Sequence, residues 1–453
     1  MSLQSSISPD SSRHGLTPTA YARRLLDSLD LPTLEVGAEV GADYRSPSQL
    51  WAQSGAMWLS GHADASPRHC PAPLAACAQG AWLALAAVAD NQLDPGFEAF
   101  RLLGERAAIA GLTRCGRTAP GGACQLLATA DGALALNLPR EDDVDLLPAW
   151  LQHPLTDTAE LAALLRRRNS GELVARARLL GLAAAEVAPP QPVSSWYRST
   201  QFGPVAAGRR RDKPLVIDLS ALWAGPLCAQ LLASCGARVI KVESVTRPDG
   251  ARSGPPAFYD LMNCGKESVA LDLAAEQGRL QLQQLLSCAD IVIESARPRG
   301  LEQMGIYAAD ILAANPGMVW LGITGYGRRS PMREWIAYGD DAGVAAGLSW
   351  LMGGDRGDPV FAGDAIADPL TGLHAALLAW SSWVAGGGRL LDISLHDVVA
   401  HCIAAGTAQL EDPVSEHPVP APERPVARPA RSVAAPLGAD TERVLRELLS
   451  GSR

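Results

Sequence analysis

Two aspartates stand four residues apart in an otherwise apolar stretch, VFAGDAIADPLTGLHAALLAW, at residues 360–380. Asp368 precedes a proline and a long Ala/Leu run, the pattern of a helix N-cap followed by proline at the first helical position. A helix N-terminus also stabilises negative charge, so an ionised carboxylate there can act as nucleophile or base. Spacing alone favours the capping role for Asp368, and we interpret Asp364 as a loop residue.

A second stretch, LVIDLSALWAGPLCAQLLASCGARVIKVES at 215–244, has the pattern of a strand, a helix and a second strand. Gly225 and Pro226 open the expected helix, and a helix N-terminus at the carboxyl edge of a parallel sheet is a place where phosphates bind. Glu243 stands where NAD enzymes keep the acid that binds ribose. The turn has one glycine and a proline where the dinucleotide fingerprint needs three glycines, which disfavours NAD.

The other acids, histidines and cysteines carry weaker signals. Asp340 and Asp341 are adjacent, and adjacent residues of a helix do not face each other, so no cooperating pair is expected. We assign structural or solvent-exposed roles to His374, His396 and His401. Nine cysteines, an odd number with no C-x-x-C pair, predict reduced thiols in the cytoplasm and neither disulfides nor a metal site.

Five short apolar runs, rich in β-branched residues, must position these groups. Helical patterns separate the first four, which predicts a parallel sheet covered on both faces. We therefore expect an α/β fold: a doubly wound, mostly parallel sheet with a smaller, helix-rich α+β domain. The predicted strands are 215–220, 238–243, 291–295, 319–325 and 390–395.

The chain has 453 residues, enough for more than one domain. A hairpin is predicted at 123–138, with its turn at Asp131-Gly132. The predicted segments are a disordered N-terminus at 1–15, a small domain at 16–193, a linker at 194–213, a Rossmann-like catalytic domain at 214–410 and a Pro-rich tail with a short C-terminal helix at 411–453.

Charge and hydropathy argue against some partners. The formal net charge is −9, and the chain has no sustained basic run except Arg209–Arg211, which argues against nucleic acid. Polar residues interrupt every apolar stretch before it reaches about 20 residues, so no membrane span is predicted. The polar N-terminus gives no sign of a signal peptide.

The two halves of the chain resemble each other. Residues 55–87 match 347–379 at ten positions without a gap, and Gly80 falls on Gly372. We interpret this match as a trace of common descent. Asp368 falls on Ala76, so one copy has a carboxylate that the other lacks.

Six stretches of the second half together resemble the family III CoA-transferases, a group that includes formyl-CoA and carnitine CoA-transferases and the related 2-methylacyl-CoA racemases. Their order and spacing match throughout 214–400, and APLGADTERVLREL at 435–448 resembles the C-terminal signature of the family. The six are VIDLSALWAGPLCAQLLASCGARVIKVES, NCGKESVALDL, ADIVIESARPRGLEQMGI, GITGYGRRSP, GDAIADPLTGLHAAL and LLDISLHDVVA.

The resemblance implies that Asp368 is a catalytic nucleophile as well as a cap. It implies an enzyme that moves CoA from an acyl-CoA to a carboxylic acid through covalent aspartyl intermediates. The resemblance implies no permanently bound cofactor. It also implies a homodimer. The positions implied to lie near CoA are Gly225, Pro226, Arg252, Arg297, Lys241 and Lys266, with Gly121 and Gly122 in a loop that can close over the site.

Departures from the family pattern keep other functions open. Ser295 replaces the usual asparagine. Racemases place a histidine beside an aspartate where this chain reads Gly339-Asp340-Asp341, and its absence weakens the racemase interpretation because epimerisation needs a second proton carrier. Residues 102–139 and 157–190 resemble the later half of the family and yet precede the first half, so the halves look rearranged. The alternatives are a 2-methylacyl-CoA racemase or epimerase and a non-catalytic CoA-binding protein.

Overall fold

The computed structural model describes residues 16–449, with gaps at 32–33, 35, 37–44, 91, 156–157, 203–204, 206–211, 355–356 and 407–419. The predicted disorder at 1–15 and the run Arg209–Arg211 therefore lie outside the described residues.

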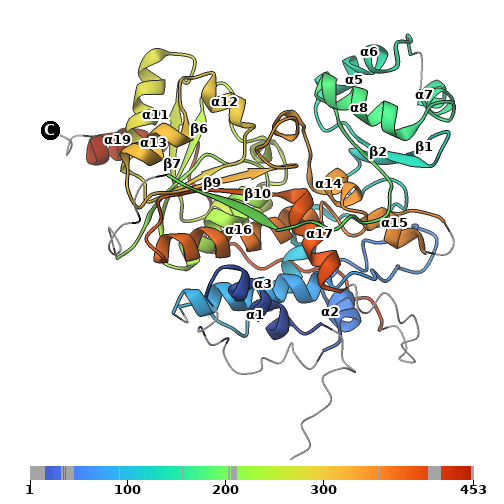
Figure 1. Cartoon of the computed structure of the whole chain (residues 1–453), viewed down its shortest axis with the longest axis horizontal. Coiled ribbons are helices and arrows are strands. Elements are labelled where there is room, and N and C mark those ends of the chain that lie inside the picture. Colours follow the sequence, from blue (N-terminus) through green and yellow to red (C-terminus); the bar gives the residue numbers. More distant parts are fainter. Residues whose placement is uncertain are drawn as a thin grey trace, which may run out of the picture.

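A seven-stranded sheet forms the centre of the molecule (Figure 1). Its order is β4-β10-β9-β8-β5-β6-β7, and every neighbouring pair is parallel except β4 with β10. The α/β class and the five predicted strands are confirmed. The strands are β4 (Tyr197–Gln201), β5 (Leu215–Asp218), β6 (Arg238–Ser244), β7 (Glu267–Leu271), β8 (Ile291–Glu294), β9 (Val319–Thr324) and β10 (Arg389–Ser394).

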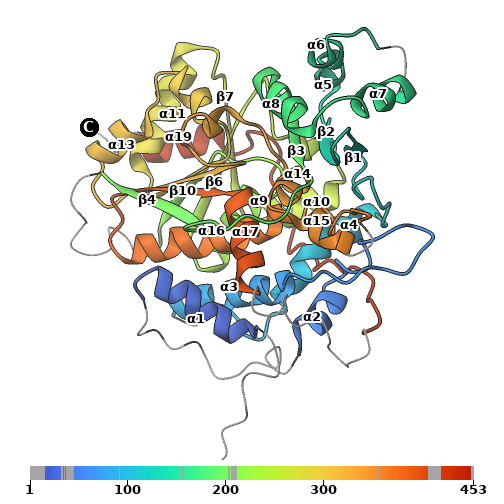
Figure 2. The same cartoon turned by 45° about the vertical axis from the view of Figure 1, so that its right-hand side comes forward.

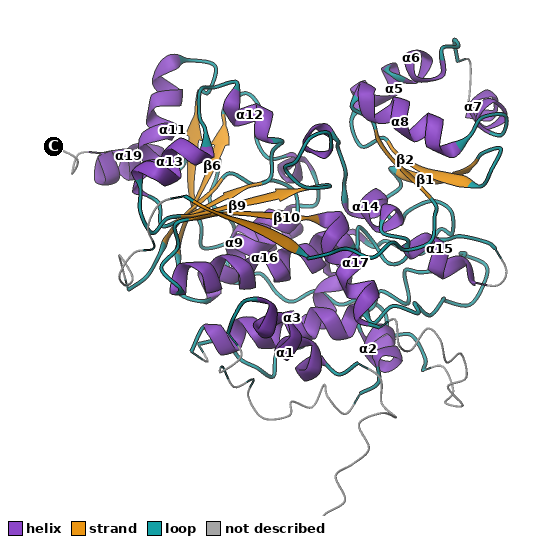
Figure 3. Cartoon of the chain, in the orientation of Figure 1, coloured by secondary structure: helices purple, strands orange, loops and turns teal. Residues whose placement is uncertain are grey.

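Helices cover both faces of this sheet (Figure 3). Alternate residues of one strand enter different cores: Val216 packs with the helices of one face, whereas Leu215 and Ile217 pack with those of the other. The first face carries α9 (Ala224–Ser234), α10 (Pro256–Asn263), α14 (Gly339–Ala345), α15 (Leu348–Gly353), α16 (Ala367–Val384) and α17 (Leu395–Ala405). The second carries α11 (Glu276–Cys288), α12 (Pro298–Glu302), α13 (Ala308–Ala314) and α19 (Thr441–Leu449).

The predicted small domain at 16–193 is divided between two places in the structure. Its first part supplies α1 (Pro18–Ser28), α2 (Pro47–Gln53) and α3 (Leu74–Val88), which lie beneath α16 in Figures 1 and 2 and share one core with it. Apolar surface on both α3 and α16 explains this extra layer, since each helix is buried almost all round.

The second part forms a separate small α+β unit with its own core. The predicted hairpin is confirmed, because Cys124–Ala128 (β1) pairs antiparallel with Ala133–Asn137 (β2), and Ala183–Glu186 (β3) adds a third strand. Its helices are α5 (Glu141–Asp145), α6 (Leu147–Leu151), α7 (Thr158–Leu165) and α8 (Ser170–Leu180), and α4 (Glu105–Ala110) leads into the unit.

The helix pairs α1–α3 and α9–α16 are built alike. Both α1 and α9 have 11 residues, and each is followed one residue later by a left-handed residue, Asp30 at φ 58° or Gly236 at φ 97°. A Cβ on Gly80 of α3 would lie 2.6 Å from the Pro18 carbonyl oxygen of α1, and a Cβ on Gly372 of α16 would lie 2.9 Å from that of Ala224 on α9. The match inferred from sequence therefore extends to a second helix.

Two predicted connecting segments take part in the fold. The linker at 194–213 includes β4, because the edge beside β10 can be paired by a short polar strand. The Pro-rich tail is held wherever it is described: Arg428 contacts Glu105 at 2.9 Å, and Ser268 donates to Asp440 at 2.9 Å. The tail thus contacts α4 through Arg428 and the edge strand β7 through Asp440.

Candidate active site

Asp368 lies in the first turn of α16, which begins at Ala367. The prediction that it is the N-cap is wrong, because a tight turn before the helix places Ile366 at that position. The Asp368 side chain is therefore free to accept hydrogen bonds from the backbones of Ala224 and Gly339, on two other helices. A Cβ on Gly339 would collide with the Asp368 carboxylate, so only glycine permits this approach.

Asp368 combines burial with access. Burial raises the pKa of Asp368 to about 6, against the opposing effects of Arg106 and the two backbone hydrogen bonds. Its side chain nevertheless lines a cavity of 240 Å³. A carboxylate with few water contacts and a reachable oxygen fits a nucleophile or base.

Asp364 is fully buried and forms an ion pair, which the loop interpretation did not foresee. Arg106 Nε donates to Asp364 Oδ2 at 2.8 Å, and Arg106 Nη2 donates to the other oxygen. Such a two-pronged contact compensates for burying the carboxylate. Arg106 comes from α4, in the N-terminal half, 258 residues away in the chain.

Asp340 and Asp341 bring two more carboxyls to this region. Burial and the neighbouring Asp364 raise the pKa of Asp340 to about 7, and its Oδ1 accepts from the Ala365 N–H at 2.8 Å. Burial also raises the pKa of Asp341 to about 7, while its Oδ1 accepts from Asn137 Nδ2 at 2.8 Å. As expected for adjacent residues, each has its own partner.

The cavity beside Asp368 opens at the carboxyl ends of the parallel strands. Leu222 follows β5, Ser295 follows β8, and Gly325 follows β9, and all three line it. This edge is where open α/β sheets bind ligands. The cavity shares Arg140, Arg297, Trp335 and Ile336 with a larger cleft of 1310 Å³.

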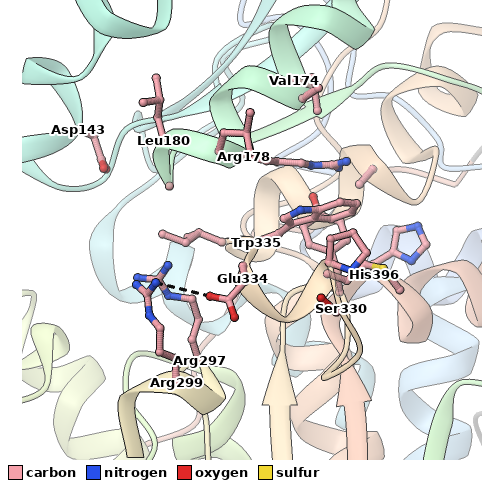
Figure 4. Close-up of a pocket in the computed structure, with 18 of the residues that line it drawn as sticks. Asp143, Val174, Arg178, Leu180, Arg297, Arg299, Ser330, Glu334, Trp335 and His396 are labelled. Atoms are coloured by element: carbon pink, nitrogen blue, oxygen red, sulfur yellow. Dashed lines mark ion pairs between the residues drawn. The ribbon is translucent and has the colours of Figure 1, made fainter. Parts of the chain in front are cut away.

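The larger cleft lies between the sheet and the small α+β unit and is rich in arginine (Figure 4). Arg178 stacks on Trp335 with its guanidinium carbon 3.9 Å from the ring centre. Arg297 and Arg299 lie together on the other side, beside Glu334. Burial, Arg299 and Arg140 lower the pKa of Arg297, which indicates a positive local potential. The arginines that line the cleft are Arg140, Arg178, Arg198, Arg247, Arg297 and Arg299.

Three of the predicted CoA-binding cations have other partners. Lys241 pairs with Asp249 at 2.9 Å and is 1% exposed. Lys266 donates to Asp218, Asn263 and the Pro226 carbonyl at 2.9–3.0 Å, which uses all three of its protons. These lysines fix the turn between β5 and α9, and the structure gives neither a path to a ligand.

Arg252 is likewise engaged. Its guanidinium donates twice to Glu243, at 2.9 and 2.6 Å, and lies 4.4 Å from the Tyr259 ring centre. Glu243, whose position in the sequence matches that of the ribose-binding acid in NAD enzymes, is thereby paired with Arg252. Among the predicted cations, only Arg297 lines the two cavities, so it is the one that we retain.

The predicted glycines occupy tight places. Gly225 lines the small cavity, and a Cβ there would collide with Ser220, so the turn into α9 requires glycine. Pro226 lies in the first turn of α9. A Cβ on Gly121 would lie 2.9 Å from Arg106 Nη2, which puts the loop of Gly121 and Gly122 over the Arg106–Asp364 pair.

The structural role assigned to His374 agrees with its surroundings. Its Nδ1 is 2.7 Å from the Leu370 carbonyl, and its Nε2 is 2.9 Å from Tyr21 Oη on α1. His401 lies against the same tyrosine ring, and His396 contacts Asp397 at 2.9 Å. Within the described ranges, no group of three or more His, Cys, Asp or Glu side chains is placed to hold a metal ion.

Residues 213–435 match the model of CoA-transferase family III. This segment, just under half of the chain, is therefore similar to that family. An acyl-CoA transferase from Fusarium pseudograminearum is 34% identical over 203 residues, which are 40% of this chain and 44% of that protein. A succinate–glutarate CoA-transferase from Agrobacterium fabrum is 32% identical over 206 residues, 42% of this chain and 52% of that protein.

The similarity is partial in length. This chain spans about half of the curated relatives that it matches, for example 47% of the human succinyl-CoA:glutarate CoA-transferase, at 32% identity. A solved structure of a hypothetical protein from Mycobacterium tuberculosis has a TM-score of 0.41 and 26% identity, covering 45% of this chain and 60% of that one. The family III segment holds β5 to α17, and thus Asp368.

Sequence did not indicate Arg106. It lies outside the family III segment, and nothing in the pattern around it suggests a partner so distant in the chain. The expected loop at Gly121 and Gly122 was the available signal, since that loop covers the guanidinium.

Proposed function

We propose that this protein is a CoA-transferase and that Asp368 is its nucleophile. One observation carries the proposal: in the family III segment, a carboxylate held by two backbone N–H groups lines a cavity at the carboxyl edge of the sheet. Covalent catalysis suits this group, because it divides one difficult exchange into easier steps.

Four displacements complete the exchange. The Asp368 carboxylate attacks the thioester carbonyl of an acyl-CoA and expels the CoA thiolate, which leaves a mixed anhydride. The thiolate attacks the Asp368 carbonyl, releases the first acid and forms an aspartyl thioester. The acceptor carboxylate attacks this thioester to form a second anhydride and thiolate. The thiolate then attacks the acceptor acyl group, which yields the new acyl-CoA and restores Asp368.

The two connected cavities suit the two parts of CoA. The arginine-rich cleft suits its phosphates, since guanidinium groups bind phosphate oxygens well. The small cavity suits the thioester end, next to Asp368. Arg297 lines both and is placed to guide the pantetheine arm from one to the other.

Replacement of the nucleophile tests the proposal. We expect Asp368→Asn to abolish transfer between acyl-CoA and acid while CoA still binds, because an amide is a poor nucleophile of similar size. Incubation of the unaltered protein with acyl-CoA and hydroxylamine should convert Asp368 to a hydroxamate, detected by mass spectrometry of its peptide. Undiminished transfer in Asp368→Asn would rule out the assignment.

Asp310→Asn is the matched control, since Asp310 also lies in the first turn of a helix, α13, but is exposed to solvent. Transfer should be unchanged in this variant. Exchange of the C2 hydrogen of an acyl-CoA with deuterium, without any acceptor acid, would instead indicate a racemase. CoA binding with neither reaction would indicate a non-catalytic protein.

The acyl-CoA and acid substrates, the homodimer and the cytoplasmic location remain part of this proposal. None of the nine cysteines, all of which lie within the described residues, forms a disulfide, as in a reducing compartment. None of the helices that the structure describes has the length and apolar character to span a bilayer.

A further inference from the structure

Four carboxyl groups and one guanidinium occupy the region around the start of α16. Asp364 and Asp368 come from the turn and helix of α16, Asp340 and Asp341 from α14, and the guanidinium is that of Arg106 from α4. Negative charges in one buried region disfavour the ionisation of each further carboxyl group, and a nearby positive charge opposes this effect.

Arg106 is held in place on three sides. Its fork binds both oxygens of Asp364, which is fully buried. Its guanidinium carbon lies 5.7 Å from the ring centre of Trp223, the residue before Ala224. The Gly121 backbone covers it from above, where a Cβ would lie 2.9 Å from Nη2.

These contacts connect Arg106 to Asp368 in two ways. The Asp364 contact fixes the turn immediately before α16, and the Trp223 contact touches the start of α9, whose Ala224 backbone binds Asp368. The charge of Arg106 also acts directly on Asp368 and on Asp340.

We propose that Arg106, in the N-terminal half, is a positioning residue that keeps Asp368 ionised and oriented for attack. This inference rests on the proposed function, because it gives the nucleophile a cation from outside the family III segment. It also assigns a role to the N-terminal half beyond covering the core.

Direct titration of Asp368 tests the role of this charge without any turnover. Full-length protein labelled with carboxyl-¹³C aspartate gives one resonance that disappears in Asp368→Asn, and its chemical shift is followed against pH. We expect a midpoint near 6 in the unaltered protein. In Arg106→Gln the midpoint should rise by about one pH unit, because a nearby cation lowers a carboxyl pKa by about that much or more.

Three further variants separate charge from packing. Arg106→Lys keeps the charge and should keep the midpoint, although its transfer rate should fall because lysine lacks the fork. Asp364→Asn removes a negative neighbour and should lower the midpoint. Arg106→Gln alone leaves Asp364 as a buried, unpaired charge, so the double variant Arg106→Gln/Asp364→Asn serves as a second test if the single variant does not fold. The midpoint of Asp368 in the double variant should still lie above that of the unaltered protein.

The groups that face Asp368 bear on these titrations and stay unchanged in every variant except where named. They are Arg106, Asp364, Asp340, Asp341, Tyr338, Arg140, Arg297 and Arg333. Equal shifts in Arg106→Gln and Asp364→Asn, or none in either, would overturn the inference. If the Asp368 midpoint rises in Arg106→Gln and falls in Asp364→Asn, but the unaltered protein transfers no CoA, the effect of Arg106 on Asp368 is supported and the proposed function is wrong.

Discussion

At the scale of single residues, burial distinguishes groups that hold the fold from groups that can meet a ligand. Lys241, Lys266 and Arg252 have the charge that CoA phosphates need, yet their hydrogen-bonding capacity goes to neighbouring acids and carbonyls. Sequence shows the charge but not the partner, which is why it could not distinguish these three cations from the fourth. Arg297 differs because the cavities reach it.

We expect Arg297→Ala to weaken CoA binding by about tenfold or more, since a charge-assisted hydrogen bond contributes about 1.5–3 kcal/mol. The loss should shrink as salt concentration rises, because screening already weakens the contact in the unaltered protein. Isothermal titration with CoA at two salt concentrations measures both effects. Arg446→Ala, on the exposed side of α19, should bind CoA normally. Equal weakening in the two variants would contradict a specific role.

At the scale of elements, apolar runs predicted the inner strands well, and polar edge strands were missed. β5, β8 and β9 are nearly continuous apolar runs because both their faces are buried. β4, with the sequence YRSTQ and a mostly exposed pattern, carries no such signal and becomes a strand only because β10 offers it an edge. The start of α16 was placed two residues too late for a similar reason, since the turn before the helix is set by contacts far away in the chain.

The paired helices α1–α3 and α9–α16 support a comparison between equivalent glycines. Gly80→Ala and Gly372→Ala should each destabilise the protein by about 1–3 kcal/mol, because the added methyl would meet a backbone carbonyl at 2.6 or 2.9 Å. Urea unfolding measures this. Only Gly372→Ala should also slow transfer, because it displaces the Ala224 end of α9 that binds Asp368.

Gly300→Ala is the control for stability, since the nearest atom to its new Cβ would be 4.0 Å away. Its unfolding midpoint should not fall. A loss of transfer in Gly80→Ala as large as that in Gly372→Ala, at equal stability, would show that α1–α3 also takes part in the site.

At the scale of the whole molecule, the two halves share a core and a site. One apolar core runs from Leu25 on α1 through Leu83 on α3 to Leu377 on α16. Across it, Arg106 of the N-terminal half pairs with Asp364 of the family III segment. This interdependence could not be predicted from sequence, because periodicity shows which face is apolar but not which distant face covers it.

Assembly is testable at this scale. The family resemblance implies a homodimer, so we expect analytical ultracentrifugation at micromolar concentration to give the sedimentation coefficient of two associated chains. A single chain under the same conditions would contradict that prediction. It would indicate that α1 and α3, which resemble the α9–α16 pair, cover the apolar surface of α16 in place of a partner subunit.

The contact of α3 with α16 also has a consequence for synthesis. The ribosome releases α3 nearly 280 residues before α16, the helix that covers it. During that interval the nascent N-terminal half exposes Leu and Ala side chains with nothing to cover them, which favours aggregation and recruits chaperones. The same delay affects Glu105, whose partner Arg428 is translated 323 residues later. The first half of this protein therefore reaches its folded state only after residues far along the chain have been synthesised.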